Sequence, residues 1–231
     1  MESEDLPAYG TYVEVKAGDQ VLEGDLFVPP DAQGLLLFAH GSGSSRRSAR
    51  NRYVAGRLQN AGFATLLIDL LTPREEKIDE HTHHLRFDIP LLSRRFLDAS
   101  DWVCDYEETR HLPIGAFGAS TGAAAALITA AKRPDRILAV VARGGRPDLA
   151  KRSLRDVRTP TLFVVGEKDP AVIELNRQAM ALMRSKTELV IVPGASHLFE
   201  EPGKLEEVAR LAANWFVSNL ASFGRRPDAA Y

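Results

Sequence analysis

The feature that most constrains the fold is the segment Gly118-Ala119-Ser120-Thr121-Gly122, which follows a short apolar run at residues 112–117. An alanine-rich run over residues 123–131 begins directly afterwards. The pattern predicts a buried strand, a tight turn and a helix, with Ser120 at the apex of the turn. Glycines two positions before and after the serine leave space where a side chain would collide with the strand or the helix. We therefore expect Ser120 to be a nucleophile; the alternative is a turn of small residues that carries a solvated serine.

The composition suits one α/β domain over residues 1–231. The chain is 45% hydrophobic and 26% charged, and it contains no repeat or linker. Its net charge of −2 does not favour nucleic acid as a partner. The acidic start, residues 1–5, does not resemble a secretory signal, and no apolar run is long enough to cross a bilayer. The single cysteine, Cys104, excludes an internal disulfide and is expected to be a small buried side chain. These features predict a cytoplasmic protein without a membrane partner, either a monomer or a small homo-oligomer.

Strand and helix signals alternate along the chain. Predicted strands cover residues 11–16, 20–28, 35–39, 63–68, 112–117, 137–142, 161–165 and 188–192. Predicted helices cover residues 49–60, 89–106, 123–131, 172–183 and 205–220. This order predicts a doubly wound, mostly parallel sheet with helices on both faces, and an antiparallel hairpin from the first two strands. Residues 70–90 are expected to form a weakly structured surface excursion, a minimal cap.

The loops after the strands carry the candidate catalytic side chains, because the carboxyl ends of parallel strands converge. Asp169 follows the strand at 161–165, and His197 follows the strand at 188–192. His197 would take the proton from Ser120 and return it to the leaving group, while Asp169 would fix the imidazole tautomer. Without catalysis, Asp169 would be a turn residue before a proline and His197 a turn residue near the last helix.

Two other carboxylates compete with Asp169. Glu167 lies two residues earlier in the same loop, nearer the strand, and has less reach towards the loop of His197. Asp69 ends the strand at 63–68 and precedes Ser120, which breaks the order serine, acid, histidine.

Backbone N–H groups are needed to stabilise the oxyanion formed in acyl transfer. Thr121, directly after the nucleophile, is one expected donor. Ser42 is the other, because Gly41 and Gly43 on either side allow its backbone to approach a substrate. His40 is expected to brace this loop.

Four motifs together resemble the α/β-hydrolase superfamily, specifically its small dienelactone-hydrolase-like members. They are His40-Gly41-Ser42, Gly118-Ala119-Ser120-Thr121-Gly122, Gly166-Glu167-Lys168-Asp169 and Gly194-Ala195-Ser196-His197. The resemblance covers about residues 20–220. It implies the triad Ser120, Asp169 and His197, with the oxyanion donors Ser42 and Thr121.

One departure from that family bears on the substrate. Dienelactone hydrolases proper carry cysteine at the nucleophile position, where this chain has Ser120. The serine points to a carboxylesterase-like hydrolase that cleaves a small or medium ester, lactone or thioester through an acyl-enzyme, without a cofactor. Acyl transfer to an alcohol or amine is the alternative reaction of the same triad.

Several basic groups have two interpretations. Arg143 and Arg146 follow the strand at 137–142 and are candidates for binding a substrate carboxylate; pairing with Asp148 at the surface is the other interpretation.

The tract His81-Thr82-His83-His84 lacks a second pair of ligands, so no metal is predicted. The arginines before and inside the first helix are expected to form a solvated basic helix end; they are Arg46, Arg47, Arg50 and Arg52.

Two non-hydrolase alternatives remain. Gly41-Ser42-Gly43 after a strand, with Asp69 ending the next, resembles a dinucleotide-binding pattern, but Arg46 occupies the third glycine position. The second alternative is a hydrolase-fold protein that only binds.

Overall fold

The computed structural model describes residues 10–220; the acidic start of the chain lies outside this range. Eight strands form one sheet in the order β1-β2-β4-β3-β5-β6-β7-β8. They are β1 (Thr11–Ala17), β2 (Gln20–Phe27), β3 (Leu35–Ala39), β4 (Ala64–Ile68), β5 (Ile114–Ala119), β6 (Ile137–Arg143), β7 (Thr161–Gly166) and β8 (Thr187–Val192). The β1–β2 and β2–β4 pairs are antiparallel and all others are parallel, which confirms the predicted sheet.

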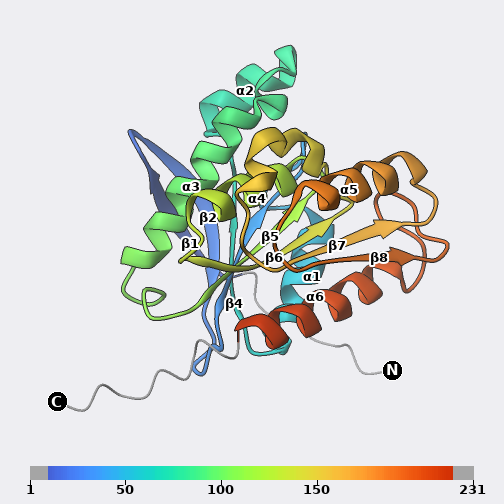
Figure 1. Ribbon diagram of the computed structural model, residues 1–231. Helices are drawn as coiled ribbons and strands as arrows, with labels where there is room; N and C mark the ends of the chain where they lie inside the picture. Colours follow the sequence, from blue (N-terminus) through green and yellow to red (C-terminus); the bar gives the residue numbers. More distant parts are fainter. Residues whose placement is uncertain (1–9, 221–231) are drawn as a thin grey trace.

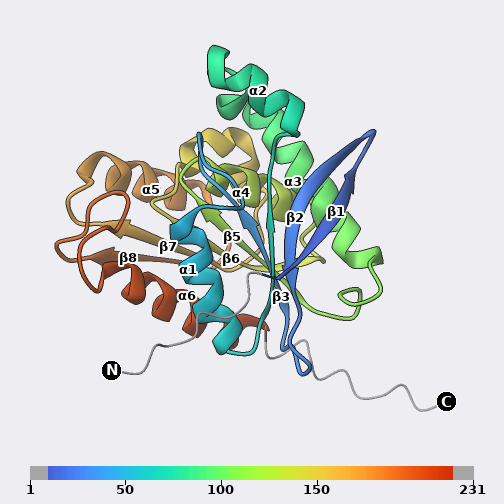
Figure 2. The same ribbon diagram turned by 180° about the vertical axis from the view of Figure 1, so that it is seen from behind.

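Helices cover both faces of the sheet (Figures 1 and 2). On one face lie α1 (Ala49–Asn60) and α6 (Lys204–Leu220), which contact each other. On the other lie α3 (Ile89–Asp105), α4 (Gly122–Lys132) and α5 (Pro170–Leu182), together with the short 3₁₀ segment η2 (Pro147–Arg155). The five α-helices named here lie close to their predicted positions.

The core has two main halves, one on each face of the sheet. Along β3, Leu35 and Leu37 pack towards α3 and α4, while Leu36 and Phe38 pack towards α1 and α6. This alternation explains why the central strands read as continuous apolar runs. Cys104 is half-buried against the first half, and its thiol donates to the carbonyl of Ser100 at 3.3 Å. That contact agrees with its predicted packing role.

Residues 70–90 are more regular than predicted. They form α2 (Pro73–Thr82), which projects at the top of Figure 1, and a 3₁₀ turn, Leu85–Phe87. The Thr72 hydroxyl accepts from the N–H of Glu75 at 3.2 Å, and the Glu75 carboxylate accepts from the N–H of Thr72 at 2.8 Å. This capping box, with Pro73 in the first turn, starts the helix. The signal was present in the sequence as Thr-Pro-Arg-Glu.

The segment η2 was not predicted either. Lys151 interrupts it with φ 50° and ψ −122°, so neither half is long enough to show helical periodicity in the sequence. Among residues 10–220, no helix has the length and apolar character that crossing a membrane requires.

Candidate active site

Ser120 occupies a strained turn between β5 and α4. Its φ is 50°, in the left-handed region that non-glycine residues rarely adopt. A Cβ at Gly118 would lie 2.5 Å from the Ala123 Cα, and a Cβ at Gly122 would lie 2.3 Å from the Ala39 carbonyl oxygen. The two glycines are therefore required by backbone crowding on both sides of the serine. Strain of this kind is concentrated at functional sites.

Asp169 and His197 lie in direct contact. The His197 Nδ1 is 2.6 Å from the Asp169 Oδ2. A carboxylate at Nδ1 favours the tautomer in which Nδ1–H donates to Asp169 and Nε2 is free to accept a proton. Both side chains are partly exposed, and both follow strands, β7 and β8, at the same edge of the sheet.

The competing carboxylates have other partners. The Glu167 carboxylate accepts from the N–H of Gly194 at 2.7 Å, which ties the two loops together. Asp69 accepts from the backbone N–H of Arg46 at 2.6 Å and also binds the Arg46 guanidinium. Neither is aimed at His197, since both carboxylates are used elsewhere.

The segment 143–146 connects the turn of Ser120 with His197. The Ser120 N–H donates to the Arg143 carbonyl at 3.1 Å, and the Arg146 N–H donates to the Ser120 carbonyl at 3.0 Å. Gly144 has φ 51°, and a Cβ there would lie 3.1 Å from the His197 carbonyl oxygen and 3.4 Å from its Cε1. The packing role of Gly144 was not predicted, because only the arginines of this segment carry a signal in the sequence.

Ser120 and His197 are not hydrogen-bonded to each other within the described residues. Such catalytic contacts often tighten only when the substrate binds.

The two expected oxyanion donors lie on either side of Ser120. Within residues 10–220, the N–H groups of Ser42 and Thr121 make no hydrogen bond to protein atoms. A Cβ at Gly41 would lie 3.1 Å from the Ser120 Cβ, so this loop packs directly against the nucleophile. Within this range, neither N–H is therefore occupied by a protein acceptor.

His40 braces the Ser42 loop, as predicted. Its Nε2 accepts from the N–H of Leu70 at 3.0 Å, and its Nδ1–H donates to the Gly41 carbonyl at 2.9 Å. Burial lowers the pKa of His40, so the neutral ring is favoured.

Comparison with known proteins fits this arrangement. The family model described as the dienelactone hydrolase family matches residues 22–224. The chain belongs to the dienelactone hydrolase family. A crystal structure of a dienelactone hydrolase from Anabaena variabilis is 56% identical, with a TM-score of 0.89, over 90% of this chain and 97% of that one. The protein Est1E from Butyrivibrio proteoclasticus is 18% identical with a TM-score of 0.75, over 91% of this chain and 99% of its own, and shares the fold.

Curated relatives carry a different name. Two proteins from Mycobacterium tuberculosis strains, each provisionally named a phosphoribosyl transferase, are 52% identical to this chain over 220 residues. The match covers 95% of this chain but 49% of each relative, so the chain spans about half the length of these proteins.

In this dienelactone hydrolase family member, Glu201 organises the loop that carries His197. Its carboxylate accepts from the Ser196 N–H at 3.0 and 3.1 Å, from the Ser196 hydroxyl at 3.2 Å and from Lys168 at 3.3 Å. The hydrogen bond from the Ser196 backbone is the main cause that lowers the pKa of Glu201 to about 2. This role of Glu201 was not predicted, because no local motif marks a contact across five positions of a loop.

The two candidate arginines differ sharply. Arg146 forms a two-fold contact with the Asp148 carboxylate, at 2.9 and 2.8 Å, which is the surface pairing that the sequence left open. Arg143 is not a surface residue: it is 7% exposed, and the one hydrogen bond of its side chain within residues 10–220 runs from Nη2 to the Asn51 Oδ1 at 3.3 Å.

The prediction of a solvated basic helix end is wrong for Arg46. Its side chain is 7% exposed and lies among Glu23, Asp25 and Asp69. Arg52 adds a second contact to Asp25 at 3.0 Å. Two carboxylates within β2 and one directly after β4 thus surround a cation that the sequence pattern predicted to be solvated.

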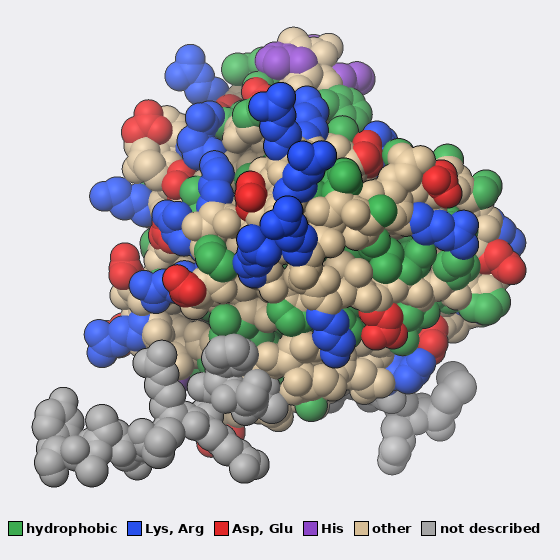
Figure 3. Space-filling view, viewed as in Figure 1, with side chains coloured by type: hydrophobic (Ala, Val, Ile, Leu, Met, Phe, Trp, Pro, Cys, Tyr) green, Lys and Arg blue, Asp and Glu red, His purple; other side chains and the backbone are tan. Residues whose placement is uncertain are grey.

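The histidine tract carries no metal cluster. Histidine side chains gather at the top of Figure 3, over α2. No group of three potential ligands that could hold a metal exists among residues 10–220. His81 instead contacts the Lys77 carbonyl through Nδ1 at 3.0 Å, and the His84 Nδ1 contacts the Thr82 hydroxyl at 2.8 Å.

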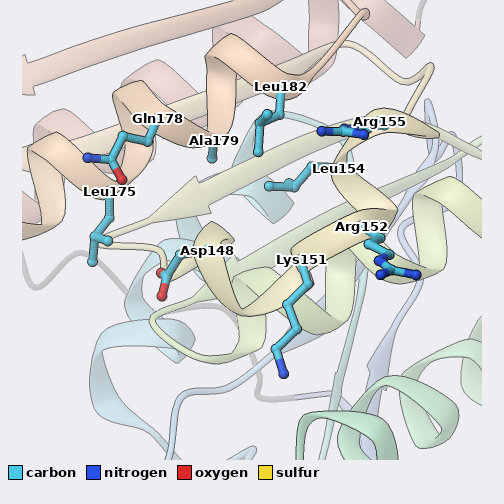
Figure 4. A pocket seen from close by; sticks show the side chains of 9 residues that line it. All are labelled: Asp148, Lys151, Arg152, Leu154, Arg155, Leu175, Gln178, Ala179 and Leu182. Carbon is cyan, nitrogen blue, oxygen red and sulfur yellow. The ribbon is translucent and has the colours of Figure 1, made fainter.

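A cavity of about 520 Å³ lies between η2 and α5 (Figure 4). Leu154, Ala179 and Leu182 form its apolar part, and none of the candidate catalytic residues lines it. The cavity therefore lies at the contact between α5 and η2 and is not part of the candidate active site.

Proposed function

We propose that this protein is a serine hydrolase that cleaves a small or medium carboxylic ester, lactone or thioester through an acyl-enzyme on Ser120. The observation that carries the proposal is the 2.6 Å contact between His197 and Asp169, at the same sheet edge as a strained serine turn. A serine hydroxyl needs such a base to act as a nucleophile at neutral pH.

In the proposed mechanism, His197 Nε2 takes the Ser120 proton as Oγ attacks the ester carbonyl. The tetrahedral oxyanion accepts hydrogen bonds from the N–H groups of Ser42 and Thr121. The bond to the leaving group then breaks, and the imidazolium returns the proton to the departing oxygen or sulfur. Water repeats the sequence on the acyl-enzyme and releases the acid, while Asp169 stabilises the imidazolium in both halves.

The names of the relatives support the proposal to different extents. The Anabaena protein is named a dienelactone hydrolase, which supports hydrolysis of an ester or lactone. The phosphoribosyl transferase name applies to proteins about twice as long as the matched region, so it does not identify the activity of the half that resembles this chain.

A fluorophosphonate probe tests the nucleophile. We expect covalent labelling of the wild type, loss of labelling in Ser120→Ala, and retained labelling in the control Ser218→Ala, whose hydroxyl donates to the Asn214 carbonyl on α6. Absence of labelling in the folded wild type would contradict the proposal.

The substrate range can be measured with a panel of p-nitrophenyl esters of rising acyl length and one lactone. We expect short and medium chains to react fastest. An added alcohol that traps the acyl group faster than water would favour acyl transfer, the alternative reaction.

A further inference from the structure

A second cavity, of about 750 Å³, lies between the start of α3, the second half of α4 and η2; we call it the α3–η2 cavity. Its volume is in the range of small-molecule sites, which are mostly apolar with a few polar groups. The apolar side chains that line it include Phe87, Ile89, Ile128 and Leu149. A ligand that fills this cavity must therefore carry an apolar body.

The charged side chains of the α3–η2 cavity are all positive. They are Arg94, Lys132, Lys151 and Arg152, and no acidic residue of the described part of the chain lines the cavity. Lysine and arginine side chains also gather over α3 and η2 on the face shown in Figure 3. Clefts lined by one sign of charge attract ligands of the opposite sign, so an anion is expected here.

These four cations lack ion-pair partners within residues 10–220. Arg94 attracts Asp98, one turn further along α3, only at a longer range than an ion pair. By contrast, Arg133, which follows Lys132 in the chain, pairs with Asp101 at 2.8 Å. The protein thus compensates a neighbouring arginine and leaves the charges around the cavity uncompensated.

A strained turn presents two of the cations. Lys151 has φ 50° and ψ −122°, a conformation that non-glycine residues rarely adopt. Figure 4 shows the side chains of Lys151 and Arg152 extending from η2 away from Leu182 of α5. Both residues also line the cavity against α3 and α4. Strain of this kind recurs at ligand clamps, which is the role that we assign to this turn.

The α3–η2 cavity is separate from the candidate active site. Ser120 lies before the first turn of α4, whereas Ile128 and Lys132 lie six and ten residues after Gly122, where the helix begins. A rise of 1.5 Å per residue places these two positions about 9 and 15 Å along the helix. None of the candidate catalytic residues and oxyanion donors lines the cavity. A ligand bound here is therefore not the ester that Ser120 attacks.

The number of uncompensated charges indicates the head group of the ligand. A phosphate monoester carries about −1.5 to −2 charges at pH 7 and three strong acceptor oxygens. Lysine binds phosphate as a point charge, and arginine binds it through two parallel hydrogen bonds. A monoanion such as a carboxylate would leave more of the positive charge uncompensated.

We propose that the α3–η2 cavity binds an amphipathic phosphate monoester, an alkyl or aryl phosphate that is free in solution. The phosphate contacts the four cations, and the apolar body packs against the apolar wall of the cavity. The inference goes beyond the proposed hydrolysis at Ser120, because it assigns a binding site in which no bond of the ligand is broken.

Titration calorimetry with octyl phosphate at pH 7, below its critical micelle concentration, tests the proposal. We expect one saturable site, with an affinity about tenfold or more higher than for neutral octyl glucoside or for inorganic phosphate. Octyl sulfate, a monoanion, should have an intermediate affinity. Added salt should weaken the binding of octyl phosphate, and Ser120→Ala should leave it unchanged.

Variants at exposed positions separate the two parts of the site. Lys132→Gln and Arg94→Gln should each weaken the binding of octyl phosphate by about three- to tenfold and leave that of octyl glucoside unchanged. Phe87→Ala should weaken the binding of both. Arg210→Gln, on α6 where Arg210 pairs with Glu207, is the control that should change neither affinity.

Four outcomes would overturn the inference. The folded wild type would show no saturable binding of octyl phosphate, or its affinity would be unchanged in both Lys132→Gln and Arg94→Gln. Competitive inhibition of p-nitrophenyl acetate hydrolysis, with an inhibition constant equal to the Kd, would place the ligand in the active site.

The fourth outcome concerns other occupants of the cavity. Sedimentation with phosphatidylcholine vesicles that contain phosphatidic acid, or tight binding of an amphipathic helical peptide of glutamate and leucine, without binding of monomeric octyl phosphate, would assign a membrane or a protein partner. Since binding is also measured in Ser120→Ala, its failure is distinguishable from failure of fluorophosphonate labelling, which tests the hydrolase proposal.

Discussion

At the scale of single residues, two residues at or near the candidate site adopt energetically unfavourable states. Ser120 carries a left-handed backbone that costs about 1–3 kcal/mol. Arg143 carries a buried charge with no anion among the described residues. The cost at Ser120 is of the kind that is tolerated where a reaction needs an exposed hydroxyl.

Removing members of the candidate triad should lower kcat on p-nitrophenyl acetate to different extents. We expect losses of about 10⁴-fold or more for Ser120→Ala and His197→Ala, and of about 10²–10⁴-fold for Asp169→Asn. Glu167→Gln is the matched control, because its carbonyl still accepts from Gly194. A larger loss for Glu167→Gln than for Asp169→Asn would assign the acid role to Glu167.

Arg143→Met should stabilise the protein. A pKa depressed from 12.5 to about 10 corresponds to about 3 kcal/mol for keeping the charge buried. The folded pKa is lowered, so the unfolded state binds more protons between pH 10 and 12.5, and the cost is fully present below pH 10. Urea unfolding at pH 7 should give a free energy of unfolding higher by roughly 1–3 kcal/mol.

Arg46→Met is the contrasting variant. It leaves the carboxylates of Glu23, Asp25 and Asp69 without their shared cation, which should cost about 3–5 kcal/mol. The same sign of change in both variants would contradict the distinction between a paired and an unpaired buried arginine.

At the scale of elements, the loops after the strands are fixed by contacts among themselves. Glu201 closes the loop of His197 through Ser196, and Glu167 ties this loop to that of Asp169. Gly144 sets the spacing between His197 and the segment that supports Ser120. Contacts among three loops, and not a single helix or strand, therefore position the candidate catalytic side chains.

Glu201 should keep its loop closed in mild acid. Its folded pKa of about 2 is depressed from 4.5, so its stabilising contribution is complete above pH 4.5 and is lost as the pH falls towards 2. Opening of this loop through protonation of Glu201 should therefore not contribute to any loss of activity in mildly acidic solution. In a pH profile of kcat/KM, Glu201→Gln should lower the plateau and leave the position of the acid limb unchanged; a shifted limb would show that loop opening contributes to it.

At the scale of the whole molecule, the sheet is held between two apolar layers. Phe38 of β3 and Phe117 of β5 stack at a centroid distance of 4.8 Å on the α1–α6 face. Phe117 belongs to the strand that ends at the serine turn, so the core and the site share one element.

Phe117→Ala should cost about 3–5 kcal/mol of the free energy of unfolding, because it opens a cavity in that layer. Phe87→Ala is the control: Phe87 is 59% exposed, and its loss should change stability by less than about 0.5 kcal/mol. Urea denaturation measures both, and equal effects would contradict the division into core and surface.

Most elements could be predicted because their signals are local. The apolar runs of β3 to β8 and the periodic faces of α3 and α6 required no knowledge of the rest of the chain. The prediction was wrong over residues 70–90, where the capping box at Thr72 and Pro73 in the first turn start a helix of polar composition. It was incomplete at η2, because Lys151 breaks the helical geometry.

Local patterns in the amino-acid sequence are enough to define the fold class, the strained serine turn and the order of the loops that carry Ser120, Asp169 and His197. Spacing of glycines and apolar residues encodes these features locally. Which of the arginine charges are compensated depends on the tertiary structure. Arg46 lies among three carboxylates and Arg146 pairs with Asp148, whereas Arg143 is buried beside α1 without a carboxylate partner. Compensation of a buried charge such as Arg46 depends on groups far apart in the chain, here Asp69, which lies 23 positions away, and the burial that makes it important exists only in the folded chain.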